Sequence, residues 1–161
     1  MNRRNLIQAV AASLAGTGLS APNVARPAVP EQDGVISVRS AYDFDETIER
    51  LKADIAAKKI MLFDVIDQAK LASGAGIELS PSTLIVFGNP PLGVQFLTSK
   101  PAAGLDWPVR LLVTKNSQGE VLAMYTDFAW IARRHGIDNR DAQFKMASEV
   151  ISSIVSTVAP K

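Results

Sequence analysis

The 161-residue chain contains no cysteine and only one histidine, His135. The lack of cysteine excludes disulfides, thiol nucleophiles, iron–sulfur clusters and cysteine-ligated zinc sites. A chain with one histidine offers few residues from which to build a Ser-His-Asp triad or a two-histidine metal site. We therefore expect neither a bound metal nor another cofactor.

Charge is also scarce in this chain. Charged residues make up 20% of the sequence and the formal net charge is only +1. Such a small net charge creates no strong attraction to nucleic acid or to an anionic membrane, so we expect no nucleic-acid partner. Apolar residues make up 47% of the chain, which is typical of a globular protein with one sizeable core.

Residues 1–20 have the layout of a secretory signal peptide. A basic start, Asn2-Arg3-Arg4-Asn5, precedes a mildly apolar stretch, and small residues at Gly18-Leu19-Ser20 suit cleavage before Ala21. The apolar stretch is shorter than a bilayer span of ~20 residues, and the arginine pair also resembles a twin-arginine signal. An ordinary export signal and an uncleaved anchor are the alternatives. We predict an exported, periplasmic protein with no integral membrane span in the mature chain and a proline-containing flexible linker over 21–33.

Residues 34–159 are predicted to form a single domain with both strands and helices. Alternating or continuous apolar runs predict strands at 35–40, 60–67, 83–88, 109–115 and 120–127. The last two strands are expected to form a hairpin joined by Asn116-Ser117-Gln118-Gly119. Two long segments with helical spacing of apolar residues complete the pattern. The fold class is therefore predicted as α+β, with two layers: an antiparallel sheet of about five strands packed against two main helices.

Local signals mark the helix ends. Asp43 and Glu46 form a capping-box pattern at the start of the first long helix. Gly136 is expected to end a short helix over 128–135. Asp138 or Asn139 is expected to cap the C-terminal helix.

The turn Gly88-Asn89-Pro90 is expected to join a buried strand to a helix capped by Asn89. A helix N-terminus can bind an anion through free N–H groups, but Pro90 and Pro91 have none. Asn89 and Gly93 therefore allow two interpretations. They could form part of a ligand site, or they could form a tight structural corner in which Gly93 permits close packing.

Five short motifs occur in order along the chain: Asp64-Val65-Ile66-Asp67-Gln68-Ala69, Leu79-Ser80-Pro81-Ser82-Thr83-Leu84, Phe87-Gly88-Asn89-Pro90-Pro91-Leu92-Gly93, Leu105-Asp106-Trp107-Pro108-Val109, and Tyr125-Thr126-Asp127 with Arg134-His135-Gly136. Together they resemble the family called domain of unknown function 302, over residues 35–158. The resemblance implies a fold like that of the TATA-box-binding-protein-like group and a homodimer. It implies no assigned activity.

One position departs from that resemblance. Many members of that family carry a residue pair similar to Asp-His at the position where this chain has Asp67-Gln68. Glutamine forms hydrogen bonds but does not titrate and is a poor transition-metal ligand. If that histidine binds a metal or moves a proton in the family, the role is lost or altered here.

Two functional hypotheses from different classes follow, and a purely structural or assembly role is a third alternative. In the first, the chain is a non-catalytic domain that binds a small apolar or anionic ligand, or a protein partner, as a homodimer. Its ligand-binding residues would be Asn89, Gly93, Trp107 and Tyr125, although such aromatics can equally be core or dimer contacts.

The second hypothesis is an enzyme that uses Asp67, His135 and Asp127 as acid–base groups, with or without an oxygen-ligated metal. Asp67 and His135 also have structural interpretations. Asp67 fits a turn or cap, and His135 fits the C-terminal end of a helix. The enzyme hypothesis requires the three side chains to converge.

Overall fold

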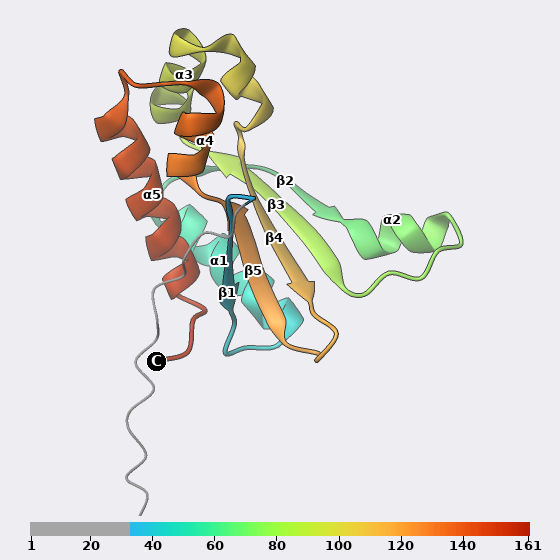
Figure 1. Cartoon of the computed structure of the whole chain (residues 1–161). Coiled ribbons are helices and arrows are strands. Elements are labelled where there is room, and N and C mark those ends of the chain that lie inside the picture. Colours follow the sequence, from blue (N-terminus) through green and yellow to red (C-terminus); the bar gives the residue numbers. More distant parts are fainter. Residues whose placement is uncertain (1–32) are drawn as a thin grey trace, which may run out of the picture.

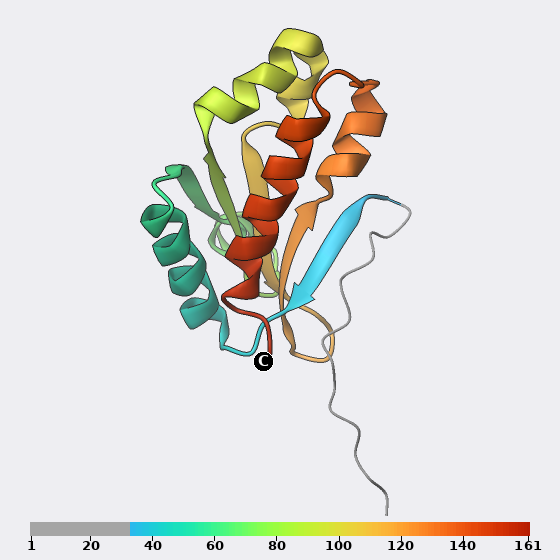
Figure 2. The same ribbon diagram turned by 90° about the vertical axis from the view of Figure 1, so that its left-hand side faces the viewer.

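The computed structural model describes residues 33–161, so the predicted signal peptide and all but the last residue of the predicted linker lie outside the described residues. Within residues 33–161, five strands form one antiparallel sheet, and the two long helices pack together on one of its faces (Figures 1 and 2). The prediction of a two-layer α+β fold is confirmed.

The sheet has the strand order β1-β5-β4-β3-β2, and each neighbouring pair is antiparallel. Strands β4 and β5 form the predicted hairpin, whose turn is held by the Asn116 side chain accepting hydrogen bonds from the backbone N–H groups of Gln118 and Glu120. The strands are β1 (Val35–Arg39), β2 (Met61–Asp67), β3 (Ser82–Gly88), β4 (Val109–Lys115) and β5 (Val121–Thr126).

Helices α1 (Phe44–Ala57) and α5 (Asp141–Ser156) cover one face of the sheet. Helix α1 begins as predicted, because the Asp43 carboxylate accepts a hydrogen bond of 2.8 Å from the Glu46 N–H. Both helices bury an apolar stripe against the sheet. The buried side chains are Thr47, Ile48, Leu51 and Ile55 on α1, and Phe144, Ala147, Ile151, Ile154 and Val155 on α5.

The predicted cap of α5 is wrong. Arg140 occupies the N-cap position and its side chain makes no capping hydrogen bond. The Asn139 side-chain oxygen instead accepts a hydrogen bond of 2.8 Å from the Ser99 hydroxyl, which ties the start of α5 to the end of α3 (Pro90–Ser99). A tertiary contact therefore uses the polar group that local sequence assigned to the cap.

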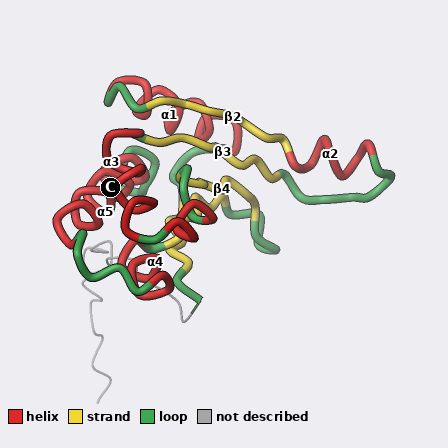
Figure 3. The backbone as a smooth tube through the Cα atoms, turned by 90° about the horizontal axis from the view of Figure 1, so that it is seen from above, coloured by secondary structure: helices red, strands yellow, loops and turns green. Residues whose placement is uncertain are grey.

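Three shorter elements complete the domain: α4 and η1 lie beside α3, and α2 lies at the opposite end of the sheet (Figure 1). Helix α4 (Phe128–His135) ends at Gly136 with φ = 59°, the left-handed conformation that favours glycine. The short 3₁₀ helix η1 (Pro101–Leu105) follows α3 and leads into β4. Helix α2 (Gln68–Gly74) has no buried residue, so it lacks the apolar periodicity by which a helix is recognised in sequence. Figure 3 shows α2 projecting beyond the rest of the domain.

The second face of the sheet is not covered by α1 or α5. Leu84 pairs with Leu112, and Leu112 pairs with Met124, so these three side chains form a row across neighbouring strands. They alternate with the buried residues Ile85, Leu111 and Ala123 and are only half-buried. We call Leu84, Leu112 and Met124 the open-face row.

Candidate functional site

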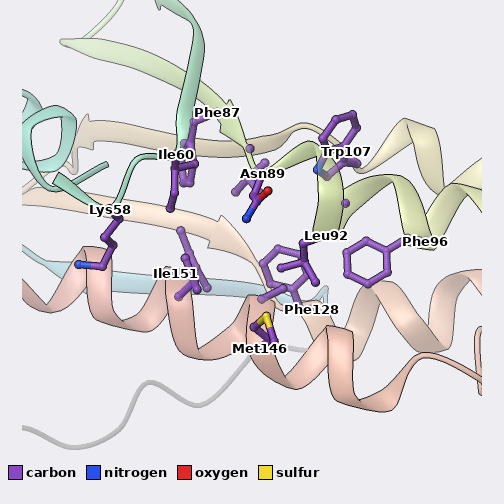
Figure 4. A pocket seen from close by; sticks show the side chains of 15 residues that line it. Lys58, Ile60, Phe87, Asn89, Leu92, Phe96, Trp107, Phe128, Met146 and Ile151 are labelled. Atoms are coloured by element: carbon purple, nitrogen blue, oxygen red, sulfur yellow. The ribbon is translucent and has the colours of Figure 1, made fainter. Parts of the chain in front are cut away.

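A cavity of about 350 Å³ lies between the end of β3, helix α3 and helix α5. Its walls are almost entirely apolar. Phe87, Leu92 and Phe96 line it from β3 and α3, while Phe128 and Ile151 line it from α4 and α5 (Figure 4). Met146, an exposed residue of α5, lies at the edge of the same space. This size and lining suit a small, mostly apolar molecule.

Asn89 supplies an amide group to this cavity. It occupies the N-cap position of α3, yet its side chain makes no capping hydrogen bond. The first helical positions are Pro90 and Pro91, which have no N–H to donate, and the Leu92 and Gly93 N–H groups bond to the Asn89 backbone carbonyl at 3.0 and 2.9 Å. The Asn89 amide is therefore free to point into the cavity (Figure 4).

Trp107 forms a wall of the cavity by packing directly on Gly93. A Cβ atom added to Gly93 would lie 1.8 Å from Trp107 Nε1, and one added to Gly88 would lie 3.2 Å from the same nitrogen. No side chain larger than hydrogen fits at Gly93 beneath this indole. Phe63 supports the ring with an edge-to-face contact at a centroid distance of 6.0 Å.

The structure brings together three of the four predicted ligand residues. Asn89, Gly93 and Trp107 all line the cavity, whereas Tyr125 lines a separate groove between β1 and α5 with Ile36 and Val155. Burial raises the pKa of the Tyr125 hydroxyl, and the negative charge of Asp127 raises it further. Tyr125 is thus a largely buried residue of the β1–β5 pair, away from the other three.

His135 is paired with a carboxylate that the sequence analysis did not single out. Its Nε2 lies 2.6 Å from Asp106 Oδ2, and the two side chains are only 7% and 4% exposed. Asp106 Oδ1 also accepts hydrogen bonds of 3.2 Å from Arg110 and from Arg134. This Asp106 cluster ties the end of η1 to α4 and β4. Asp106 lies in one of the five motifs, but nothing in its local sequence indicates a distant histidine partner.

Asp67 and Asp127 are helix caps. The Asp67 carboxylate accepts from the Lys70 N–H, and the Asp127 carboxylate accepts from the Ala129 and Trp130 N–H groups. The strand register aligns Asp67 on β2 with Ala123 on β5, three strands away. Asp127 lies four residues beyond Ala123 along the chain. Spacings of ~4.8 Å between strands and ~3.3 Å along them put the two carboxylates roughly 20 Å apart.

The three proposed acid–base groups therefore do not converge. Gln68, at the position where the family resemblance points to histidine, accepts a hydrogen bond of 2.7 Å from the Ser82 hydroxyl and so connects α2 to β3. Within residues 33–161, no group of three or more histidine, aspartate or glutamate side chains is placed to hold a metal ion.

We expect Gly93→Ala to displace the Trp107 indole and to lower the free energy of unfolding by about 2 kcal/mol, because the added methyl group overlaps the ring. The displacement is measurable as a change in Trp107 fluorescence in a Trp130→Phe background, and the stability by urea unfolding. Gly104→Ala is the matched control, since its Cβ would meet only Leu97 at an ordinary 3.7 Å. An unchanged spectrum and stability in Gly93→Ala would contradict the packing described here.

Asp106→Ala is expected to destabilise the domain by about 3 kcal/mol, because it leaves a buried histidine and two arginines without their shared carboxylate. Asp127→Ala, which removes only a helix cap, is expected to cost about 1 kcal/mol. Urea unfolding of both variants at pH 7 makes the comparison. Equal losses would show that the Asp106 cluster contributes no more than one cap.

Comparison with known proteins supports the assignment of the fold. A crystal structure of an uncharacterized conserved protein DUF302 from Bacillus stearothermophilus superposes with a TM-score of 0.70 at 13% sequence identity, covering 78% of this chain and 98% of that one. The identity is low, so this likeness concerns the fold alone. No helix within residues 33–161 has both the length and the apolar character to cross a membrane.

Curated relatives are more similar to this chain in sequence than the Bacillus protein is. Fluoride-specific ion channel FluC 1 of Brucella suis biovar 1 is 36% identical over 104 residues, which cover 65% of this chain and 41% of that protein. Fluoride-specific ion channel FluC 2 of Brucella melitensis biotype 1 is also 36% identical over 104 residues, covering 38% of its length. This chain thus spans about two-fifths of these relatives. The model of the family described as Domain of unknown function DUF302 matches residues 36–156, and the chain belongs to that family.

Proposed function

We propose that this chain is an exported, periplasmic binding domain that holds a small, mostly apolar ligand in the cavity between β3, α3 and α5, and that it works as a homodimer. The observation that carries the proposal is the cavity itself, at about 350 Å³ and with almost entirely apolar walls. Ligand sites are usually of roughly 300–1,000 Å³, and an engineered apolar cavity of about 150 Å³ already binds benzene. Export is inferred from the layout of residues 1–20.

The placement of the titratable groups favours binding over catalysis. Asp67, Asp127 and His135 are absent from the cavity walls, and each already has a structural partner. Within residues 33–161, Lys58 is the one charged residue that lines the cavity, and its ammonium group is paired with the Asp54 carboxylate at 2.6 Å. An acid–base reaction would need a proton donor or acceptor within hydrogen-bond reach of the bound molecule.

The homodimer is inferred from apolar surface that the described chain leaves uncovered. The open-face row is half-buried, and the two long helices that the structure describes, α1 and α5, both lie on the other face of the sheet. Nine large apolar side chains are exposed within residues 33–161, and six of them fall between residues 61 and 79, on β2, α2 and the loop that follows. A second copy related by a twofold axis would cover both surfaces with their own equivalents, because such an interface is self-complementary.

Fluoride transport is not part of this proposal. The Brucella relatives are named as fluoride channels, but this chain spans only about two-fifths of their length. What the chain shares with them is a segment of 104 residues.

We expect the neutral dye N-phenyl-1-naphthylamine to bind the purified domain with a rise in fluorescence, and Ala147→Leu to weaken that binding by about tenfold or more. Ala147 is a buried wall residue of the cavity, so the larger side chain fills space that the dye needs. Ala142→Leu makes the same change at an exposed position of α5 and should leave the affinity unaltered. Absence of dye binding, or equal affinities for the two variants, would refute the ligand part of the proposal.

We expect Leu112→Lys to convert the dimer to a monomer, because it puts two charges into the centre of an apolar interface between equivalent faces. Sedimentation equilibrium over a range of protein concentrations measures the change. Ser153→Lys introduces the same charge on the exposed side of α5 and should leave the dimer intact. A monomeric wild-type domain, or a Leu112→Lys variant that remains dimeric, would rule out this interface.

A further inference from the structure

We propose that the ligand carries an uncharged hydrogen-bond acceptor, such as the carbonyl group of a ketone or ester, and that the Trp107 indole N–H and the Asn89 amide bind this group. The inference rests on the proposed function, since it specifies the chemistry of the molecule in the same cavity. It depends on the corner between β3 and α3, where both polar groups meet an otherwise apolar wall.

The indole nitrogen of Trp107 is placed as an open donor. It lies over Gly88 and Gly93, so no side chain from either residue covers it. Within residues 33–161, every fully buried side-chain nitrogen or oxygen has a hydrogen-bond partner. The Trp107 indole nitrogen has no such partner among residues 33–161, so it is not fully buried and must be accessible from the cavity or from solvent. An indole N–H can only donate. A molecule that displaces water from it must therefore offer an acceptor or lose a hydrogen bond.

Asn89 adds a second group at the same corner. The two prolines that follow it leave its side chain without a capping role, and its amide points into the cavity between Phe87 and Leu92 (Figure 4). The backbone N–H groups of Leu92 and Gly93 are already bonded to the Asn89 carbonyl. The donors available to a ligand are thus two side chains, the Trp107 indole and the Asn89 amide, rather than a row of backbone N–H groups suited to phosphate.

The balance of charge selects an uncharged acceptor over a carboxylate. Among the residues that the structure describes, Lys58 is the one charged residue of the lining, and its ammonium group lies 2.6 Å from the Asp54 carboxylate. Figure 4 places Lys58 at the opposite end of the cavity from Trp107. A carboxylate entering this space would lose its hydration without gaining an unpaired cation, which is costly in an apolar environment.

Three probes of similar shape test the head group: acetophenone with a carbonyl acceptor, ethylbenzene with none, and benzoate with a charge. Their dissociation constants at pH 7 are measured by displacement of N-phenyl-1-naphthylamine from the intact domain. We expect Asn89→Leu and Trp107→Phe each to weaken acetophenone by about 3- to 10-fold, the value of one lost hydrogen bond. Ethylbenzene should change by less than about twofold, because it uses neither group.

Lys145→Met removes a charge from the exposed side of α5, outside the cavity lining, so as the control it should leave the affinity for acetophenone unaltered. Lys58→Met removes the charge at the far end of the lining and tests whether a charged ligand depends on it. Two results would overturn the inference while the cavity remains a ligand site. In one, Asn89→Leu and Trp107→Phe weaken acetophenone and ethylbenzene equally. In the other, benzoate binds wild type more tightly than acetophenone does and loses that advantage in Lys58→Met. If neither the dye nor any probe binds wild type, the proposed function itself fails.

Discussion

The close contact between the Trp107 indole and the Cα atom of Gly93 determines the geometry of the site. It holds the start of α3 against the segment that connects η1 to β4. Neither segment is a strand of the sheet, so strand pairing does not join them. The indole can approach this closely only because position 93 has no side chain. The cavity is the space left between this fixed corner and α5, so its shape follows from one steric fit more than from the regular sheet.

Val109 and Phe128 lie between the apolar cavity and the polar Asp106 cluster. On one side these two residues line the cavity, and on the other they line a small hollow beside Asp106. The buried Asp106 carboxylate is satisfied by His135 and by two half-exposed arginines, so the cluster stabilises the packing of α4 without presenting a reactive group to the cavity. The His135–Asp106 pair thus has a structural role, because it joins α4 to the end of η1.

The sequence predicts the parts of this fold that depend on neighbouring residues. The Asp43 cap, the left-handed Gly136 and the β4–β5 hairpin are all determined within a few residues, and the structure confirms each of them. The stripe of apolar residues likewise identifies the buried side of α5. The position of the corner at Asn89 is also predicted, since its prolines and glycines restrict the backbone directly, but the expected side-chain cap by Asn89 is wrong because its amide makes no capping hydrogen bond.

Features that depend on distant residues escape the same reasoning. The partner of His135 is 29 residues away in the chain, and Asn139 bonds to Ser99 instead of capping the next helix. Tyr125 resembles Trp107 as an aromatic candidate, yet strand alternation and pairing with β1 place it in a different groove. In each case a tertiary contact decides between roles that are equally compatible with the local sequence.

Helix α2 has a consequence for how the domain loses its structure. Because it buries no side chain, its opening exposes little apolar surface and breaks mainly local hydrogen bonds. The Gln68–Ser82 hydrogen bond is the side-chain link between the start of this helix and β3. In a single copy of the chain this projecting helix can therefore open without unfolding the core, and the second copy proposed above would oppose that opening by covering the exposed Leu71.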